Sequence, residues 1–145
     1  MKLSELKNLY DVVIVGSGIA GLYAALNFPP TVSILMLSKK ERHISNSSLA
    51  QGGVACVLDL ENDSYDFHFE DTLIAGGRKN DPYAVRTLVE EGPCDVLRTI
   101  EYGVEYDRNE NGELIKTLEG GHSKRRILHH KDTSGKEMVD KLVLA

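Results

Sequence analysis

The sequence predicts an α/β fold that begins with a strand, a helix and a second strand. Residues 12–15, VVIV, form a short β-branched run of the length of a buried strand. Apolar residues then recur at helical spacing, at Ile19, Leu22, Tyr23 and Leu26, before two prolines. Residues 32–37, VSILML, have the composition of a second strand. Elements of these types in this order predict a βαβ unit with two parallel strands.

The turn between the first strand and the helix carries three glycines in G-x-G-x-x-G spacing, at Gly16, Gly18 and Gly21. In such a turn the first glycine permits the bend, the second lets the backbone approach a pyrophosphate, and the third lets the helix pack on the strand. The unpaired amides at the helix N-terminus attract the anion. Because both flanking elements are of the required type, the motif predicts a dinucleotide site.

One residue of the usual dinucleotide pattern is missing. An acid that binds the ribose normally follows the second strand, about 20 residues after the glycines. This chain has Ser38, Lys39 and Lys40 there, before Glu41. Ribose recognition by a carboxylate is therefore not supported, which weakens an NAD interpretation. Lys39 either contacts the adenosine half or a phosphate of a nucleotide, or is a solvated lysine at a strand end.

Length and composition predict one globular domain. The chain has 145 residues, is 41% hydrophobic and carries a net charge of -5, which gives no reason to expect nucleic acid or an anionic membrane as a partner. Residues 1–10 are too polar for a signal peptide, and no apolar run approaches the roughly 20 residues of a membrane span. We expect a soluble, cytoplasmic protein in which Cys56 and Cys94 are reduced and lie in the core or half-buried.

The next segments are expected to be scaffold. Residues 54–60, VACVLDL, form a strand-like run, after which Asp63 or Ser64 caps a helix that continues to Gly76 and Gly77. The aromatic residues of SYDFHFED, residues 64–71, have helical spacing, which favours core packing over a cofactor site. His68 among them is expected on the surface or half-buried.

Two short helices and a hairpin are expected next. Asp81 and Pro82 open a helix that Gly92 ends, and Pro93 starts another that Gly103 ends. Residues 104–107 and 113–117 then flank NENG at 109–112, which predicts a hairpin with an Asn-Gly turn.

A last helix is expected at the end of the chain. Ser134 and Glu137 have capping-box spacing, and Met138, Leu142 and Val143 begin an apolar face. No later element covers that face before the sequence ends. We therefore expect residues 1–145 to be a fragment cut within a helix, with no second domain.

Residues 119–132, EGGHSKRRILHHKD, combine three of the five histidines with a cationic cluster. Arginine binds carboxylates with a planar fork, and histidine donates hydrogen bonds or exchanges protons near neutral pH. Zinc binding by His129 and His130 is disfavoured, because adjacent histidines point apart on a strand and no cysteine lies nearby. Nucleic acid is disfavoured by the acidic chain. An anion site and a solvated basic edge both remain open.

Together these segments resemble the succinate dehydrogenase and fumarate reductase flavoprotein family, and within it the L-aspartate oxidase branch. The resemblance rests on VVIVGSGIAGLYAAL, SNSSLAQGGVA, HFEDTLIAGG and EGGHSKRRILHHKDTSGKE, of which the last is the most specific. It implies a Rossmann-like FAD-binding domain, of which residues 1–145 are the N-terminal part. The second FAD-binding segment, the capping domain and the catalytic arginine of the family would lie beyond Ala145.

The resemblance implies noncovalent FAD. Relatives with covalent flavin have a histidine five residues before the glutamine of AQGG, where this chain has Asn46. The cofactor residues that it implies are Gly16, Ser17, Gly18, Ile19, Ala20 and Gly21 at the pyrophosphate, Lys39 near the adenosine half, and Asn46, Ser47, Ser48, Leu49, Ala50, Gln51, Gly52 and Gly53 toward the isoalloxazine. Backbone amides at the two glycines would approach the flavin ring closely.

The resemblance also implies a substrate. Glu119 matches the position that orients L-aspartate, and a carboxylate suits its α-ammonium group, which succinate lacks. His122 is a second candidate, and no metal is implied. Without the resemblance, Glu119 would be a surface acid before a Gly-Gly turn.

The reaction implied is hydride removal from the Cα of L-aspartate to flavin, giving iminoaspartate, with reoxidation by oxygen or fumarate. Quinolinate synthase would then use the product in NAD biosynthesis. Two alternatives remain: a succinate or fumarate flavoprotein, and a noncatalytic nucleotide-binding module. The isolated chain is expected to be inactive and to bind FAD weakly or not at all.

Overall fold

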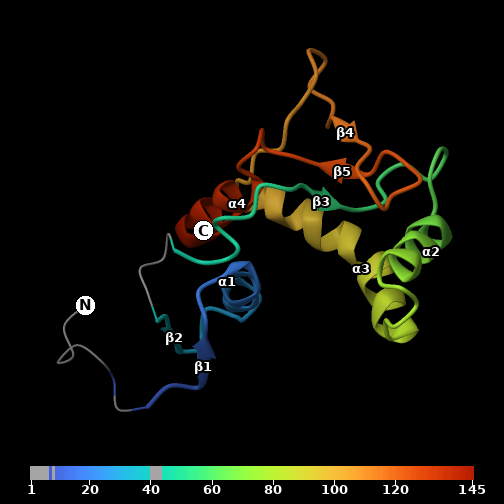
Figure 1. Cartoon of the computed structure of the whole chain (residues 1–145). Helices are drawn as coiled ribbons and strands as arrows, with labels where there is room; N and C mark the ends of the chain where they lie inside the picture. Colours follow the sequence, from blue (N-terminus) through green and yellow to red (C-terminus); the bar gives the residue numbers. More distant parts are fainter. Residues whose placement is uncertain (1–6, 8, 40–43) are drawn as a thin grey trace.

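The computed structural model describes residues 7, 9–39 and 44–145. Its elements, in chain order, are β1 (Val12–Val15), α1 (Ile19–Leu26), β2 (Ile34–Leu37), β3 (Val54–Ala55), α2 (Tyr65–Ala75), α3 (Pro82–Glu101), β4 (Lys116–Thr117), β5 (Ile127–Leu128) and α4 (Ser134–Leu144) (Figure 1). The expected α/β class is confirmed. Within the described ranges, no helix is long and apolar enough to cross a membrane.

The first part of the chain is the expected βαβ unit. Strands β1 and β2 are parallel, in a register that sets Val12 opposite Ile34 and Val15 opposite Leu37. The second strand starts two residues later than the apolar run. Gly16 bends the chain after β1 with φ of 114°, a conformation that L side chains rarely adopt. A Cβ on Gly21 would lie 2.2 Å from the Gly16 carbonyl oxygen, so α1 packs against the turn only because residue 21 is glycine.

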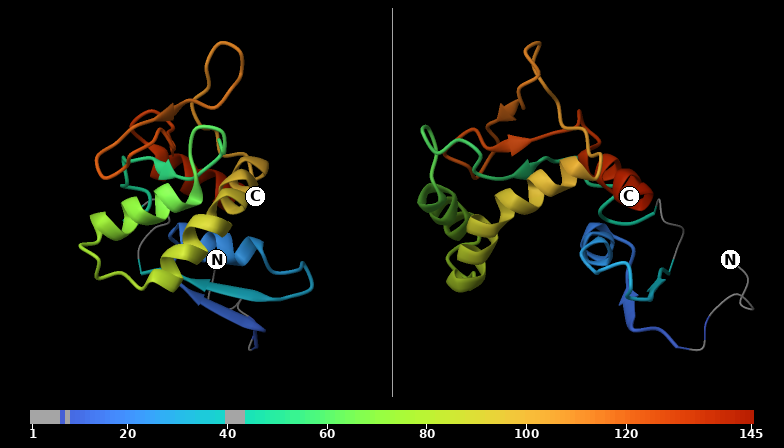
Figure 2. Two further views of the ribbon diagram at one scale, coloured as in Figure 1. Left: turned by 90° about the vertical axis from the view of Figure 1, so that its right-hand side faces the viewer. Right: turned by 180° about the vertical axis from the view of Figure 1, so that it is seen from behind.

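The second part is a small antiparallel sheet in the order β3-β5-β4, with α3 beside it (Figure 1). Its core is the buried cluster Cys56, Val96, Val104, Tyr106, Leu128 and Met138. Strand β3 covers only part of the run expected at 54–60. Helix α4 lies between α1 and this sheet in both views of Figure 2.

Helix α3 corrects the expectation of two short helices. It continues through Gly92 and Pro93 for 20 residues. Its buried residues, Val85, Val89, Pro93, Val96 and Thr99, recur every three or four positions along one face. Burial of this single stripe holds the helix together, although proline removes one backbone donor.

The last helix corrects two further expectations. The apolar face of α4 is covered, because Val139 and Leu142 pack with Leu22 of α1. The capping box does not form. The Ser134 hydroxyl instead accepts from the His130 N–H at 3.1 Å, and Glu137 Oε1 accepts from the Glu105 N–H at 3.0 Å.

The hairpin forms next to its turn, where the Ile115 N–H donates to the Asp107 carbonyl at 2.9 Å and Arg108 pairs with Leu114. The Gly112 N–H donates to the Asn109 carbonyl, but residues 104–107 make no strand. The Asp107 N–H donates to the His129 carbonyl, and the second arm, β4, pairs with β5. Local pairing thus holds the residues next to the turn, and tertiary partners bind the arms farther away.

Three side chains differ in exposure from what the sequence predicts. His68 is only 3% exposed, rather than half-buried or on the surface. Phe67 is exposed rather than in the core, and the Lys124 ammonium lies 5.2 Å from its ring centroid. Cys56 is buried as expected, but Cys94 is exposed, because it lies outside the buried stripe of α3.

Candidate functional site

The dinucleotide turn is bound to the segment that follows β2. The Ser47 hydroxyl accepts from the Ile19 N–H at 3.2 Å, and a Cβ on Gly18 would lie 2.9 Å from that hydroxyl. Two of the predicted cofactor segments, 16–21 and 46–53, therefore meet at the N-terminus of α1. We call residues 46–53 the flavin loop.

The helix N-terminus fits an anionic pyrophosphate. The N–H groups of Ala20 and Gly21 donate to no other residue in the described part of the chain, so a phosphate oxygen can accept from them. A Cβ on Gly16 would meet nothing within 4 Å, so the turn is open on that side.

The other predicted cofactor residues lie at different places. Ser17 is buried and its hydroxyl donates to Ser38 at 2.9 Å. Lys39 is exposed after β2, and its neighbours Lys40 and Glu41 lie outside the described residues. Ser48 forms reciprocal bonds with Ser45. The exposed members of the flavin loop are Asn46, Leu49, Ala50, Gln51 and Gly52.

The end of the flavin loop lies against the second sheet. A Cβ on Gly53 would lie 2.4 Å from the Leu128 carbonyl oxygen and 2.9 Å from His129 Cε1. Only glycine allows this approach. The loop predicted for the flavin is thus in contact with the segment that carries the histidines.

His129 connects this contact to Glu119. Its Nε2 lies 2.9 Å from Glu119 Oε1 and 2.7 Å from Thr117 Oγ1. His130 turns the other way, toward the Glu105 carbonyl, as expected for adjacent histidines. Within the described residues, His, Cys, Asp and Glu side chains form no group of three that could hold a metal ion.

Arg126 is part of a buried cluster. Its side chain is 1% exposed and binds Asp63 through two bonds, of 2.7 and 2.8 Å, and Asp71 through one of 2.6 Å. Burial acts to raise the pKa of both carboxyls, but their hydrogen bonds, chiefly to Arg126 and Ser123, and the arginine charge lower it below the usual value. Arg126 is therefore not free to bind a substrate carboxylate, which corrects the anion-site interpretation for this residue.

His122 lies at the edge of the Arg126 cluster. Its Nδ1 is 3.3 Å from the Arg126 guanidinium, and its ring centroid is 5.7 Å from that of His68. Burial, followed by the Arg126 charge, lowers the pKa of His68 to about 4, so this ring is neutral near pH 7. Within the described structure, the buried His68 Nδ1 has no hydrogen-bond partner.

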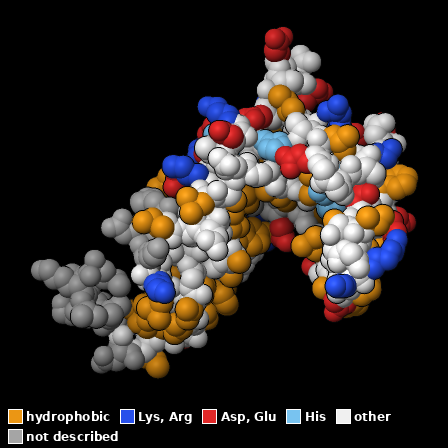
Figure 3. All heavy atoms as spheres, in the orientation of Figure 1, with side chains coloured by type: hydrophobic (Ala, Val, Ile, Leu, Met, Phe, Trp, Pro, Cys, Tyr) orange, Lys and Arg blue, Asp and Glu red, His pale blue; other side chains and the backbone are white. Residues whose placement is uncertain are grey.

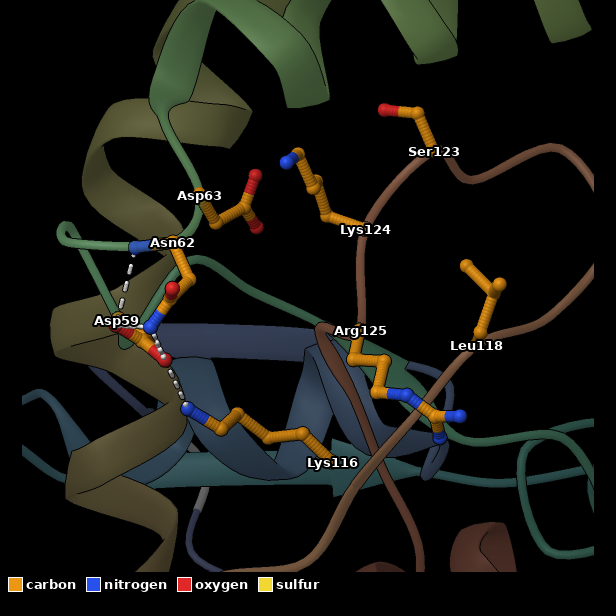
Figure 4. A pocket seen from close by; sticks show the side chains of 8 residues that line it. All are labelled: Asp59, Asn62, Asp63, Lys116, Leu118, Ser123, Lys124 and Arg125. Atoms are coloured by element: carbon orange, nitrogen blue, oxygen red, sulfur yellow. Dashed lines mark hydrogen bonds and ion pairs between the residues drawn. The ribbon is translucent and has the colours of Figure 1, made fainter.

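The basic residues of segment 119–132 line one side of an open pocket (Figure 4). The Lys116 ammonium crosses it to Asp59 at 3.0 Å. Lys124 and Arg125 project from the opposite wall, and Arg125 is exposed. This edge has the geometry of the solvated basic surface that the sequence left open.

Sequence reasoning missed three residues of the site. Asp63 and Asp71 hold Arg126, and Thr117 holds His129. Asp63 carried only the signal of a helix cap, while Asp71 and Thr117 carried no local signal for these roles. Contacts with residues 12 to 63 positions away define all three.

Comparisons with known proteins agree on the kind of domain. A family model described as "FAD binding domain" matches residues 11–143. The chain is 45% identical over 138 residues to an L-aspartate oxidase of Clostridium perfringens, which covers 95% of this chain and 31% of the relative. It is 40% identical over 141 residues to a chloroplastic L-aspartate oxidase of Oryza sativa, covering 97% of this chain and 22% of the relative.

Solved structures give the same result for the fold. A quinol fumarate reductase of E. coli superposes with a TM-score of 0.88 and 29% identity, covering 93% of this chain and 23% of that one. Sdh1 of Mycobacterium smegmatis in complex with UQ1 superposes with a TM-score of 0.85 and 30% identity, covering 92% and 23%. The chain spans less than a third of the length of each of these proteins.

Proposed function

The chain belongs to the FAD binding domain family, and on this premise we propose that it is the N-terminal part of an L-aspartate oxidase. Residues 1–145 would supply the dinucleotide half of the cofactor site and one wall of the substrate site. The 45% identity to an L-aspartate oxidase supports this over the succinate-oxidising relatives.

The proposed reaction converts L-aspartate to iminoaspartate. FAD, when bound, supplies the acceptor for the hydrogen and the electron pair that leave the substrate Cα. Oxygen would then be reduced to peroxide, or fumarate to succinate. The likeness to a fumarate reductase supports fumarate as an acceptor. Quinolinate synthase as the consumer of iminoaspartate, and a cytoplasmic location, stay predictions; the relative from Oryza sativa is named chloroplastic.

The residues of this chain would hold the cofactor without a covalent bond. The N–H groups of Ala20 and Gly21 would bind the pyrophosphate, Lys39 would lie near the adenosine half, and the flavin loop would approach the isoalloxazine. Asn46 offers no imidazole for attachment to the flavin. Denaturing the protein should therefore release all its flavin into solution.

Two successive contacts, through His129, support the proposal. Gly53, at the end of the flavin loop, lies against His129, and His129 binds Glu119. These contacts link Glu119 to the loop assigned to the flavin through one residue, which supports Glu119 as the acceptor for an α-ammonium group. A carboxylate at this place favours an amino acid over succinate, because it complements the ammonium and leaves succinate without a partner. His122 lies against Arg126 rather than against His129, and would affect substrate binding less directly than Glu119.

The test uses the longer protein that contains this chain, loaded with FAD. L-aspartate should yield peroxide, whereas succinate at the same concentration should yield none. Glu119→Gln should lower kcat/KM for L-aspartate about tenfold or more, since it removes a charge-assisted bond. Glu110→Gln, at an exposed acid in the 109–112 turn, is the matched control and should have no effect.

Two alternatives predict different results. Turnover of succinate without turnover of L-aspartate would assign the protein to the succinate and fumarate enzymes. The structural likeness to a fumarate reductase is the observation behind this alternative. FAD binding with turnover of neither compound would leave only a nucleotide-binding role.

A further inference from the structure

We propose that His129 is a positioning residue that holds the Glu119 carboxylate beside the flavin loop and thereby selects a substrate with an α-ammonium group. This inference rests on the proposed function. His129 would not touch the substrate itself; it would act through Glu119.

The contacts of His129 define where its proton lies. Its Nε2 is within hydrogen-bond distance of both Glu119 Oε1, at 2.9 Å, and Thr117 Oγ1, at 2.7 Å. An ionised carboxylate only accepts, so Nε2 must carry the hydrogen. The Thr117 hydroxyl has the Ile127 carbonyl, 3.5 Å away, as acceptor for its own proton. One N–H thus faces two acceptors, and the ring orientation is specified.

The ring is also restrained by the backbone of the flavin loop, which packs against Cε1, the atom between the two ring nitrogens. A Cβ on Gly53 would lie 2.9 Å from His129 Cε1, so the loop packs directly against the imidazole. The His129 side chain is 18% exposed. The position of the ring relative to the loop is therefore set by packing as well as by hydrogen bonds.

Within the described residues, the Glu119 side chain has His129 as its polar partner and is less buried than that ring. It lies in the exposed turn between β4 and β5, and its carboxylate is partly in solvent. Free rotation of its side chain would cost conformational entropy when substrate binds. The bond to His129 removes part of that cost in advance and leaves the second carboxylate oxygen available for an ammonium group.

The arrangement discriminates between two dicarboxylates of similar size. L-aspartate brings an ammonium group that the held carboxylate can bind, whereas succinate has none. Loss of His129 should weaken the binding of L-aspartate and leave that of succinate nearly unchanged. A residue that only stabilises the fold would affect both ligands alike.

The experiment measures dissociation constants for L-aspartate and succinate by calorimetry on the longer protein, with its FAD reduced and kept reduced under anaerobic conditions so that neither ligand is oxidised. His129→Leu, which removes the donor, should weaken L-aspartate binding about tenfold and succinate binding less than twofold. His129→Gln keeps an N–H near the position of Nε2 and should restore most of the affinity. His130→Gln changes the adjacent histidine, which faces Glu105, and is the matched control.

A double variant tests the route through Glu119. On a Glu119→Gln background, His129→Leu should weaken L-aspartate binding by less than a further twofold. Equal losses for both ligands, or independent effects that multiply in the double variant, would overturn the positioning role. If the unsubstituted protein binds L-aspartate no more tightly than succinate, the proposed function itself fails, and this outcome is recognised before any variant is measured.

Discussion

Arg126 stabilises the fold, and its guanidinium is not available to bind a ligand. From residue type alone it belonged to a cluster that could bind a carboxylate. In the structure, its guanidinium already has carboxylates on two sides, from Asp63 and Asp71. These partners join the start of α2 and its middle to the segment before β5, so the ion pairs connect parts of the chain that are distant in sequence.

Replacing Arg126 should strongly destabilise the protein. Arg126→Met leaves two carboxylates in a buried place without their partner, which should cost about 3–5 kcal/mol in the free energy of unfolding. Urea denaturation followed by circular dichroism measures this loss. Arg125→Met, at the exposed neighbour, should change stability by less than about 0.5 kcal/mol. Equal effects of the two substitutions would contradict the buried role of Arg126.

His68 should make stability depend on pH between about 4 and 6.5. Burial, then the charge of Arg126, lowers its pKa to about 4, while an unfolded histidine titrates near 6.5. Between these values the unfolded chain binds the extra proton, so stability should fall as pH decreases from 6.5 to 4, by about 3 kcal/mol in total.

His68→Leu should abolish the pH dependence in this window. The Asp63 and Asp71 carboxyls, whose pKa values are lowered, contribute stability that is lost only as pH falls through still lower values. Urea midpoints measured from pH 4 to 7 separate the two effects. An unchanged slope in His68→Leu would refute the assignment.

At the scale of elements, local signals predicted the caps of α2 and α3 but also a break within α3 that does not exist. Ser64 accepts from the Phe67 N–H at 3.1 Å and caps α2, as its residue type suggests. Asp81 caps α3 in the same way, through the Tyr83 N–H at 2.9 Å. The break expected at Gly92 and Pro93 does not form, because a buried stripe crosses both residues. Caps are local hydrogen bonds, whereas a stripe gains its energy from whatever packs against it.

Removing the cap of α3 tests this local contribution. Asp81→Ala should lower the free energy of unfolding by about 1 kcal/mol, because two backbone donors lose their acceptor. Asp81→Asn keeps an acceptor oxygen and is the control. Thermal unfolding of both variants measures the difference, and equal losses would show that the side-chain bond does not contribute.

At the scale of the whole molecule, α4 joins the βαβ unit to the three-stranded sheet (Figure 1). Its buried residues reach both cores: Met138 packs with Leu128, and Leu142 packs with Leu22. Other apolar side chains, such as Val15 on β1, stay exposed, and hydrophobic groups gather over the lower part of the face in Figure 3. Helix α4 therefore contributes buried side chains to both cores of the described structure.

Truncating the buried face of α4 should separate the two parts. Leu142 is 2% exposed and Leu144 is 82% exposed, on the same helix. Leu142→Ala should cost about 2–5 kcal/mol through lost contacts and a cavity, and Leu144→Ala less than about 0.5 kcal/mol. Urea denaturation checks both. A small loss of unfolding free energy in Leu142→Ala would mean that α4 does not stabilise the contact between the βαβ unit and the sheet.

The sequence alone was enough for the βαβ unit, its dinucleotide turn and the caps of α2 and α3. Hydrophobic periodicity, glycine spacing and cap hydrogen bonds involve residues that are close in the chain. These features can therefore be predicted from the sequence. The coverage of α4, the single helix α3, the neutral buried His68 and the burial of Arg126 were decided by tertiary structure. So was the contact of Gly53, His129 and Glu119. These depend on burial and hydrogen bonds between residues far apart in sequence, whose partners are specified only once the chain has folded.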